Sequence, residues 1–197
     1  MKPQKTYLII LLTLFICSCK NDIKKEAATI NKTSVVKNVI KTVSTIENLQ
    51  NITPINLEEF KTWFPSQLIN MQKVSVVAAP LSANDISGTV AKYQGDKTNK
   101  MQITLYDCAG KNGAMILGQY TLYKNMKVDN ESAYKIEKSF TKNGMMGVET
   151  FHKDRKFSDI SFLYRDRLAL NIKAYETDRE MVWKAIEDLK LKKLINN

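Results

Sequence analysis

Residues 134–175 carry the strongest structural pattern of this 197-residue chain, YKIEKSFTKNGMMGVETFHKDRKFSDISFLYRDRLALNIKAY. Turns at Lys142–Gly144, Lys153–Lys156 and Arg165–Arg167 divide the stretch into four segments. In the first, third and fourth segments apolar side chains recur at every second position, which is typical of a half-buried β-strand. Short turns between consecutive strands place those strands side by side and antiparallel. We therefore predict a four-stranded antiparallel meander.

The sequence before the meander predicts three more strands, at Lys73–Ala79, Ser87–Gln94 and Lys100–Cys108. The first is a run rich in β-branched residues that Pro80 closes. The other two flank a polar turn, and the last alternates apolar and polar side chains. We expect these two strands to pair as a hairpin.

Three helices are predicted from apolar residues spaced three and four positions apart. Two begin with the spacing of a capping box, in which the N-cap residue and the third residue after it exchange hydrogen bonds: Asn56 with Glu59, and Thr177 with Glu180. The middle helix covers 114–123, where Gly118 would allow close approach to a sheet.

The predicted element order is α-βββ-α-ββββ-α, all within residues 56–197. It indicates one α+β domain, with helices packed on a mostly antiparallel sheet of about seven strands. The composition is that of an ordinary globular protein, with 44% hydrophobic and 25% charged residues. Three cysteines do not make a disulfide scaffold, so a buried apolar core must supply the stability.

The first residues have the features of a secretory signal. Lys2 and Lys5 precede an apolar run from Tyr7 to Cys17, which is shorter than the ~20 residues that span a bilayer. An ordinary secretory signal would be cut close to this point. The residues Ile16-Cys17-Ser18-Cys19 resemble the lipobox of bacterial lipoproteins, in which an aliphatic residue and a small residue precede an invariant cysteine.

The lipoprotein resemblance implies that residues 1–18 are a signal peptide and that the Cys19 thiol carries fatty acyl chains such as palmitate. Two or three acyl chains hold a protein on a membrane, whereas one holds it only marginally. Lys20 differs from the aspartate that retains lipoproteins in the inner membrane, so the resemblance implies the outer membrane of a Gram-negative bacterium. Lys20-Asn21-Asp22 also resembles a surface-exposure tag, and both the periplasmic face and the cell surface stay open.

Residues 19–55 are predicted to be the tether between the anchor and the domain. From Lys20 to Ile55 there is no glycine or aromatic residue, and Pro54 is the single proline. Within this tether, apolar residues at helical spacing favour a short helix over 35–49. Such a helix would dock on a partner or pack back on its own domain; the alternative is a loosely ordered tether.

The chain has a formal net charge of +10, which residues 1–55 and 56–197 share equally. No nucleic-acid-binding motif accompanies this charge, and we predict no nucleic-acid partner. Five basic residues lie in two turns of the meander: Lys153, Arg155, Lys156, Arg165 and Arg167. If both turns project from the same end of the sheet, these residues form one positive rim that would bind an acidic partner or lipid phosphates. The alternative is two solvated turns.

Few residues suggest catalysis. Cys108 and His152 could form a thiol–imidazole pair, but no hydrolase motif surrounds either one, and a buried free cysteine is the ordinary alternative. Met126, Met145 and Met146 could join them in a soft copper site, for which core packing is the better explanation. Residues Gly110–Gly113 lack the spacing of a phosphate-binding loop. We predict no catalytic residue, metal or cofactor.

The element order is similar to that of PsbP-like domains and small envelope lipoproteins, which implies a domain that binds proteins. We therefore expect a lipid-anchored envelope protein that serves as an accessory or scaffolding subunit of an outer-membrane complex. The alternatives are an immunity or inhibitor lipoprotein that neutralises an envelope toxin, and an enzyme dependent on Cys108.

Overall fold

The computed structural model describes residues 43–96 and 98–195. The predictions for the signal peptide, for Cys19 and for most of the tether lie outside these residues. None of the described helices is long and apolar enough to cross a membrane.

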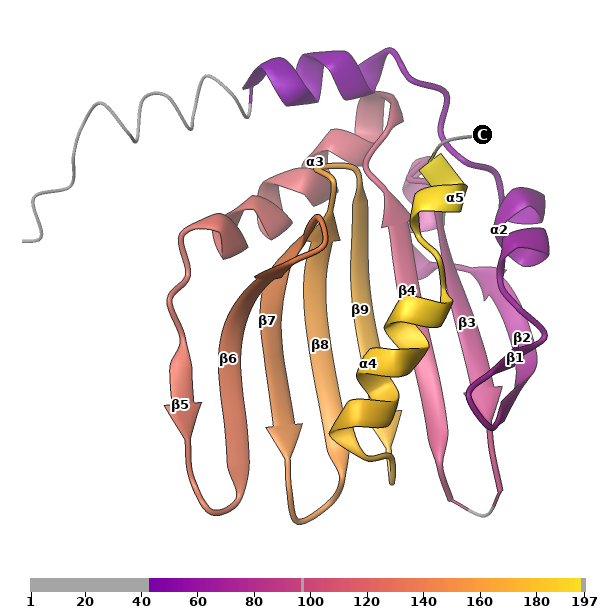
Figure 1. Cartoon of the computed structure of the whole chain (residues 1–197). Helices are drawn as coiled ribbons and strands as arrows, with labels where there is room; N and C mark the ends of the chain where they lie inside the picture. The colour runs from indigo at the N-terminus through magenta and orange to yellow at the C-terminus, as the bar shows by residue number, and fades with distance from the viewer. Residues whose placement is uncertain (1–42, 97, 196–197) are drawn as a thin grey trace, which may run out of the picture.

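One antiparallel sheet of nine strands forms the centre of the described structure, in the order β1-β2-β3-β4-β9-β8-β7-β6-β5 (Figure 1). Its strands are β1 (Gln67–Leu68), β2 (Met71–Ala78), β3 (Gly88–Gln94), β4 (Lys100–Asp107), β5 (Asp129–Glu131), β6 (Lys135–Lys142), β7 (Met145–His152), β8 (Phe157–Tyr164) and β9 (Leu168–Tyr175). The α+β class and the antiparallel sheet are confirmed, and β6 to β9 form the predicted meander. The expected number of strands, about seven, misses β1 and β5, which have only two and three residues and hence no readable pattern.

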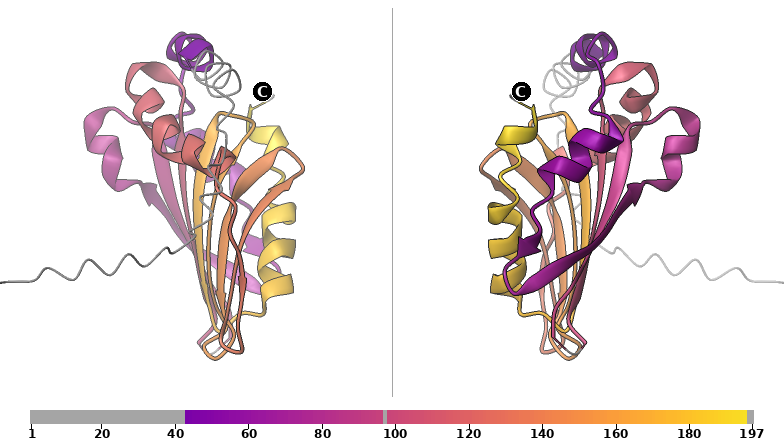
Figure 2. Two further views of the ribbon diagram at one scale, coloured as in Figure 1. Left: turned by 90° about the vertical axis from the view of Figure 1, so that its left-hand side faces the viewer. Right: turned by 90° about the vertical axis from the view of Figure 1, so that its right-hand side faces the viewer.

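The helices lie on both sides of the sheet (Figure 2). They are the stretch 43–50, α2 (Leu57–Trp63), α3 (Gly110–Thr121), α4 (Arg179–Asp188) and α5 (Lys192–Ile195), with 3₁₀ turns η1 (Pro80–Asn84) and η2 (Leu122–Lys124). The α4 helix crosses one face of the sheet, whereas α3 lies over the upper part of the other face. The lower half of that second face is left without a helix, and we call it the open face.

Two apolar cores follow from this arrangement. The larger core lies under α2, α4 and α5, where Phe60 and Val182 pack with sheet residues such as Phe162 and Ile172. The smaller core lies under α3 and joins residues of the second face to α3 and to the helical stretch 43–50, namely Leu49, Ile86, Cys108, Ile116, Leu117, Leu163 and Ala169.

Local signals at the helix ends are partly confirmed. Asn56 accepts a hydrogen bond from the Glu59 N–H and donates its own N–H to the Glu59 carboxylate, so the predicted capping box forms at α2. The second predicted box is wrong. The N-cap of α4 is Asp178, and the Thr177 hydroxyl donates instead to the carbonyl of Tyr175.

The last part of the predicted tether packs on the domain. Leu49 is buried in the smaller core and Ile55 in the larger core. The described part of the predicted helix runs over 43–50, and Ile46 also packs against the smaller core. Of the possibilities for this segment, its described residues therefore match a helix that packs back on its own domain.

Two glycines provide a direct test of this packing. A Cβ atom at Gly147 would lie 2.1 Å from the Ser161 carbonyl oxygen and 2.5 Å from the Phe162 Cβ atom, whereas a Cβ at Gly118 would meet nothing within 4 Å. The expectation that Gly118 approaches the sheet is therefore wrong, because it faces open space.

We predict that Gly147→Ala lowers the free energy of unfolding by about 1–3 kcal/mol, since overpacking forces the neighbouring strand to move. Gly118→Ala should raise it by about 0.5–1 kcal/mol, because alanine costs less backbone entropy in an exposed helix. Urea unfolding of both variants measures these changes. A neutral Gly147→Ala would contradict the β7–β8 packing.

Candidate functional site

The buried carboxylate of Asp107 connects three parts of the chain at the upper end of the sheet. Its side chain is 0% exposed and lies at the end of β4. It accepts hydrogen bonds from the backbone N–H groups of Ile55 and Ala109, each at 3.0 Å. The guanidinium of Arg167 adds two more, from Nε at 3.0 Å and from Nη2 at 2.9 Å. Four donors thus compensate the buried charge.

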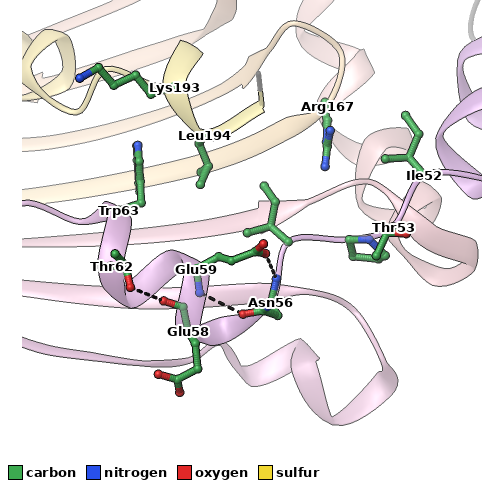
Figure 3. A pocket seen from close by; sticks show the side chains of 12 residues that line it. Ile52, Thr53, Asn56, Glu58, Glu59, Thr62, Trp63, Arg167, Lys193 and Leu194 are labelled. Carbon is green, nitrogen blue, oxygen red and sulfur yellow. Dashed lines mark hydrogen bonds between the residues drawn. The ribbon is translucent and has the colours of Figure 1, made fainter. Parts of the chain in front are cut away.

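A cleft of about 1140 Å³ opens beside this pair, between α2, α5 and the segment 52–56 (Figure 3). Trp63 and Leu194 line it together with Ile52, and Arg167 forms part of its wall. Most of the polar groups around the cleft already bind other groups of the chain: Glu59 caps α2, and Arg167 binds Asp107. The cleft therefore lacks the convergent free polar groups that characterise a catalytic pocket.

A second buried carboxylate, Glu149 on β7, fixes α4 to the sheet. Arg179 donates to it from Nε and Nη2, both at 2.7 Å, and the indole of Trp183 donates at 3.0 Å. The hydrogen bonds to Glu149 raise the pKa of Arg179, so the guanidinium stays charged. Like Asp107, Glu149 acts as a structural anion and has no free position for a substrate.

The two candidates for thiol chemistry lie far apart. Cys108 follows β4 at the upper end of the sheet and is fully buried. His152 ends β7 at the lower end of the sheet. The first residue of β7, Met145, lies at the same level as Asp107, because Tyr164 and Leu168 connect them in the strand register. His152 is seven residues further along β7. At ~3.3 Å per residue this separates them by roughly 23 Å. Burial also raises the pKa of the Cys108 thiol to about 12, which disfavours the nucleophilic thiolate.

The structure does not form the single positive rim that the sequence suggested. The turn 153–156 precedes β8, and the turn 165–167 follows it, so the two turns lie at opposite ends of the same eight-residue strand. That separation is roughly 25 Å. The condition that both turns project from one end is therefore not met, since consecutive hairpins of a meander alternate between the two ends of the sheet.

Three of the five basic residues of the expected rim pair with carboxylates of this chain: Lys153 with Glu131 at 3.0 Å, Lys156 with Asp178 at 3.0 Å, and Arg167 with Asp107 at 2.9 Å. Arg155 and Arg165 differ from them. Each guanidinium lies over an aromatic ring, 5.9 Å from the centroid of Phe157 and 5.5 Å from that of Tyr164, respectively. Neither arginine has a carboxylate partner among the described residues.

Arg155 belongs to a row of aromatic and basic side chains that crosses the lower end of the open face. Tyr175 on β9 packs on Phe157 on β8, with 4.8 Å between centroids, and Phe157 packs on His152 on β7 at 5.8 Å. The Lys100 ammonium lies 4.9 Å from the Tyr175 centroid. We call Lys100, Tyr175, Phe157, His152 and Arg155 the aromatic–basic row.

Charge on the open face is unevenly distributed. The two acidic residues that its strands present are paired: Glu137 with Lys135 at 3.1 Å, and Asp159 with Lys173 at 3.8 Å. The amide of Asn171 also donates to Asp159 at 2.6 Å. In contrast, Lys92, Lys100 and Arg155 have no ion pair within the part of the chain that the structure describes. The open face therefore carries unpaired cations, two of which, Lys100 and Arg155, lie over aromatic rings.

Sequence reasoning found Arg155 and His152 but missed Lys100, Phe157 and Tyr175. The signal was present in the strand alternation, because residues two positions apart along a strand share a face. Recognising the row also required the strand order, which places β4 beside β9, and the pattern does not reveal that pairing.

The possible copper ligands are dispersed. Met145 is buried in the larger core, Met126 is exposed, and Cys108 lies in the smaller core. Within the described residues, no group of three histidine, cysteine or carboxylate side chains is placed to hold a metal ion.

Comparison with known protein families, with characterised proteins and with solved structures finds no match to this chain.

The burial of Cys108 predicts a specific loss of stability in alkali. Its ordinary pKa of 9.0 rises to about 12 in the folded state, so the unfolded chain loses the thiol proton first as the pH rises. Between about pH 9 and 12 this thiol should therefore lower the free energy of unfolding by about 1 kcal/mol per pH unit.

Urea unfolding between pH 8 and 11, in the wild type and in Cys108→Ala, isolates this contribution. The wild type should lose stability more steeply than the variant above pH 9. Equal slopes in the two proteins would show that the thiol ionises as easily in the folded state as in the unfolded state.

Proposed function

We propose that this chain is a lipid-anchored envelope protein, held on the outer membrane through Cys19, whose open face binds an acidic segment of another envelope protein. In this proposal it serves as an accessory or scaffolding subunit of a membrane complex. The observation that carries the binding role is the aromatic–basic row together with the unpaired charge of Lys92.

Cations held over rings suit this role. Stacking on Tyr175 and Phe157 limits the positions of Lys100 and Arg155 without neutralising them, because a ring face carries no full charge. A carboxylate partner would neutralise them, as Asp178 does for Lys156. Oriented, unpaired cations lose less conformational entropy when an anionic partner binds, and they also attract it from solution.

Binding is favoured over catalysis by the state of the titratable groups. Asp107 and Glu149 each form an ion pair with an arginine. Cys108 is buried and lies roughly 23 Å from His152. A binding surface needs none of these groups to be free, whereas hydrolysis through a thiol requires an accessible thiolate beside a base.

Attachment through Cys19 predicts a clear labelling result. Cells supplied with a palmitate analogue should label the wild-type chain and Cys17→Ser, but not Cys19→Ser, because acyl transfer to the lipobox requires a thiol at the invariant position. Cys17, two residues away, is a matched control. Labelling that persists in Cys19→Ser would contradict the proposed anchor.

The partner-binding face is tested by pull-down of the full-length protein from native envelope in mild detergent, followed by mass spectrometry. We expect wild type to recover a stoichiometric partner, and Lys100→Glu/Arg155→Glu to recover at least ten times less. Ten-fold corresponds to about 1.4 kcal/mol, a modest loss for reversing two charges.

Arg165→Glu is the matched control, because Arg165 also lies over a ring without a carboxylate but at the opposite end of the sheet. It should recover the partner as the wild type does. Two results would contradict the assignment to the open face: the double variant Lys100→Glu/Arg155→Glu recovers the partner as the wild type does, or Arg165→Glu loses the partner as fully as the double variant.

A further inference from the structure

A second exposed surface, separate from the open face, lies on the solvent side of α3. Met115 is 71% exposed and Leu122 is 66% exposed, and their spacing of seven residues places them on the same side of the helix. Gly118 lies between them with open space around it, and Met126 follows just after η2 with 41% of its surface exposed. We call these four residues the α3 stripe.

The α3 stripe is not required by the core. The opposite side of α3 already supplies the buried contacts, through Ile116 and Leu117 in the smaller core. Large apolar side chains that point to solvent at helical spacing are typical of surfaces that contact another apolar phase. Scattered apolar residues would need no such explanation, but Met115, Gly118 and Leu122 follow one side of α3 and the start of η2.

The charged residues of the segment 108–128, which carries the α3 stripe, are all lysines. Between Asp107 and Asp129 the sequence contains Lys111, Lys124 and Lys127 and no acidic residue. An apolar stripe with flanking lysines is the composition of helices that lie in the interface of a bilayer, where the apolar side enters the headgroup boundary and the lysines attract anionic lipids.

The position of α3 agrees with this composition. The described chain begins at Val43, and the helical stretch 43–50 lies beside α3 in Figures 1 and 2. Ile46 and Leu49 pack in the same core as Ile116. The chain that comes from Cys19 therefore reaches the domain next to α3, with 24 residues that span at most roughly 80 Å.

We propose that α3 and η2 lie on the lipid surface of the leaflet that carries the anchor, with the α3 stripe in the headgroup boundary. The stripe and its lysines stand independently of the binding role of the open face; only the identity of the leaflet rests on the proposed anchor at Cys19. The aromatic–basic row lies on the same face of the sheet as α3, at the far end of the strands, roughly 25 Å from the upper end.

The test uses the full acylated chain in protein-free vesicles of phosphatidylethanolamine and phosphatidylglycerol. An environment-sensitive fluorophore is attached at Leu122→Cys, or at Val74→Cys as the control, because Val74 is 65% exposed and lies on β2, away from α3. Cys108 is buried and stays unlabelled. We expect a blue shift and quenching by brominated acyl chains at position 122, and neither effect at position 74.

Charge dependence provides a second measurement. Lys111→Glu/Lys127→Glu should reduce the blue shift at position 122 on vesicles with phosphatidylglycerol, and have little effect on vesicles of phosphatidylcholine alone. Emission at position 122 that stays water-like overturns the proposal, whether or not the chain floats with the vesicles. A shift that occurs in native envelope but not in protein-free vesicles also overturns it, because a protein partner would then cover the stripe. Flotation itself reports only on the anchor at Cys19.

Discussion

The arrangement of the upper end of the sheet depends on the buried carboxylate of Asp107. It holds the N-terminal segment through Ile55, the start of the α3 loop through Ala109, and the β8–β9 turn through Arg167. Removing one partner of this buried ion pair would leave an uncompensated charge, which costs about 3–5 kcal/mol. Glu149 plays the same part for α4. Arg167 and Arg179 look like surface charges in the sequence, but each joins two elements by binding a buried carboxylate.

This arrangement divides the domain into two ends with different chemistry. The upper end holds the Asp107 cluster, the helical stretch 43–50 and α3, and it exposes the apolar side chains of the α3 stripe. The lower end of the open face is aromatic and basic, with Lys100 and Arg155 fixed over rings. Eight-residue strands separate the two ends by roughly 25 Å. In our proposals the upper end contacts lipid, and the lower end of the same face binds an acidic partner.

The sequence predicted the local structure better than the site. Alternation in 134–175 predicted four strands and their antiparallel order, and the Asn56–Glu59 spacing predicted the cap of α2, since both signals are local. The box at Thr177 failed because its hydroxyl is taken by the Tyr175 carbonyl. The rim of five cations failed for a topological reason, because successive turns of a meander alternate between the ends of the sheet. The row itself depends on β4 pairing with β9 across more than sixty residues of sequence, which no local pattern encodes.

Hydrogen–deuterium exchange of the full-length wild type and of Asp107→Asn measures the role of Asp107 most directly. If Asp107 holds these segments together, Asp107→Asn should exchange faster in peptides that cover 51–56, 108–113 and 165–168, with protection of β6 and β7 retained. Glu149→Gln should instead loosen α4 and leave residues 51–56 protected. Unchanged protection at Ile55 and Ala109 in Asp107→Asn would contradict the account, and so would an equal loss of protection in all nine strands.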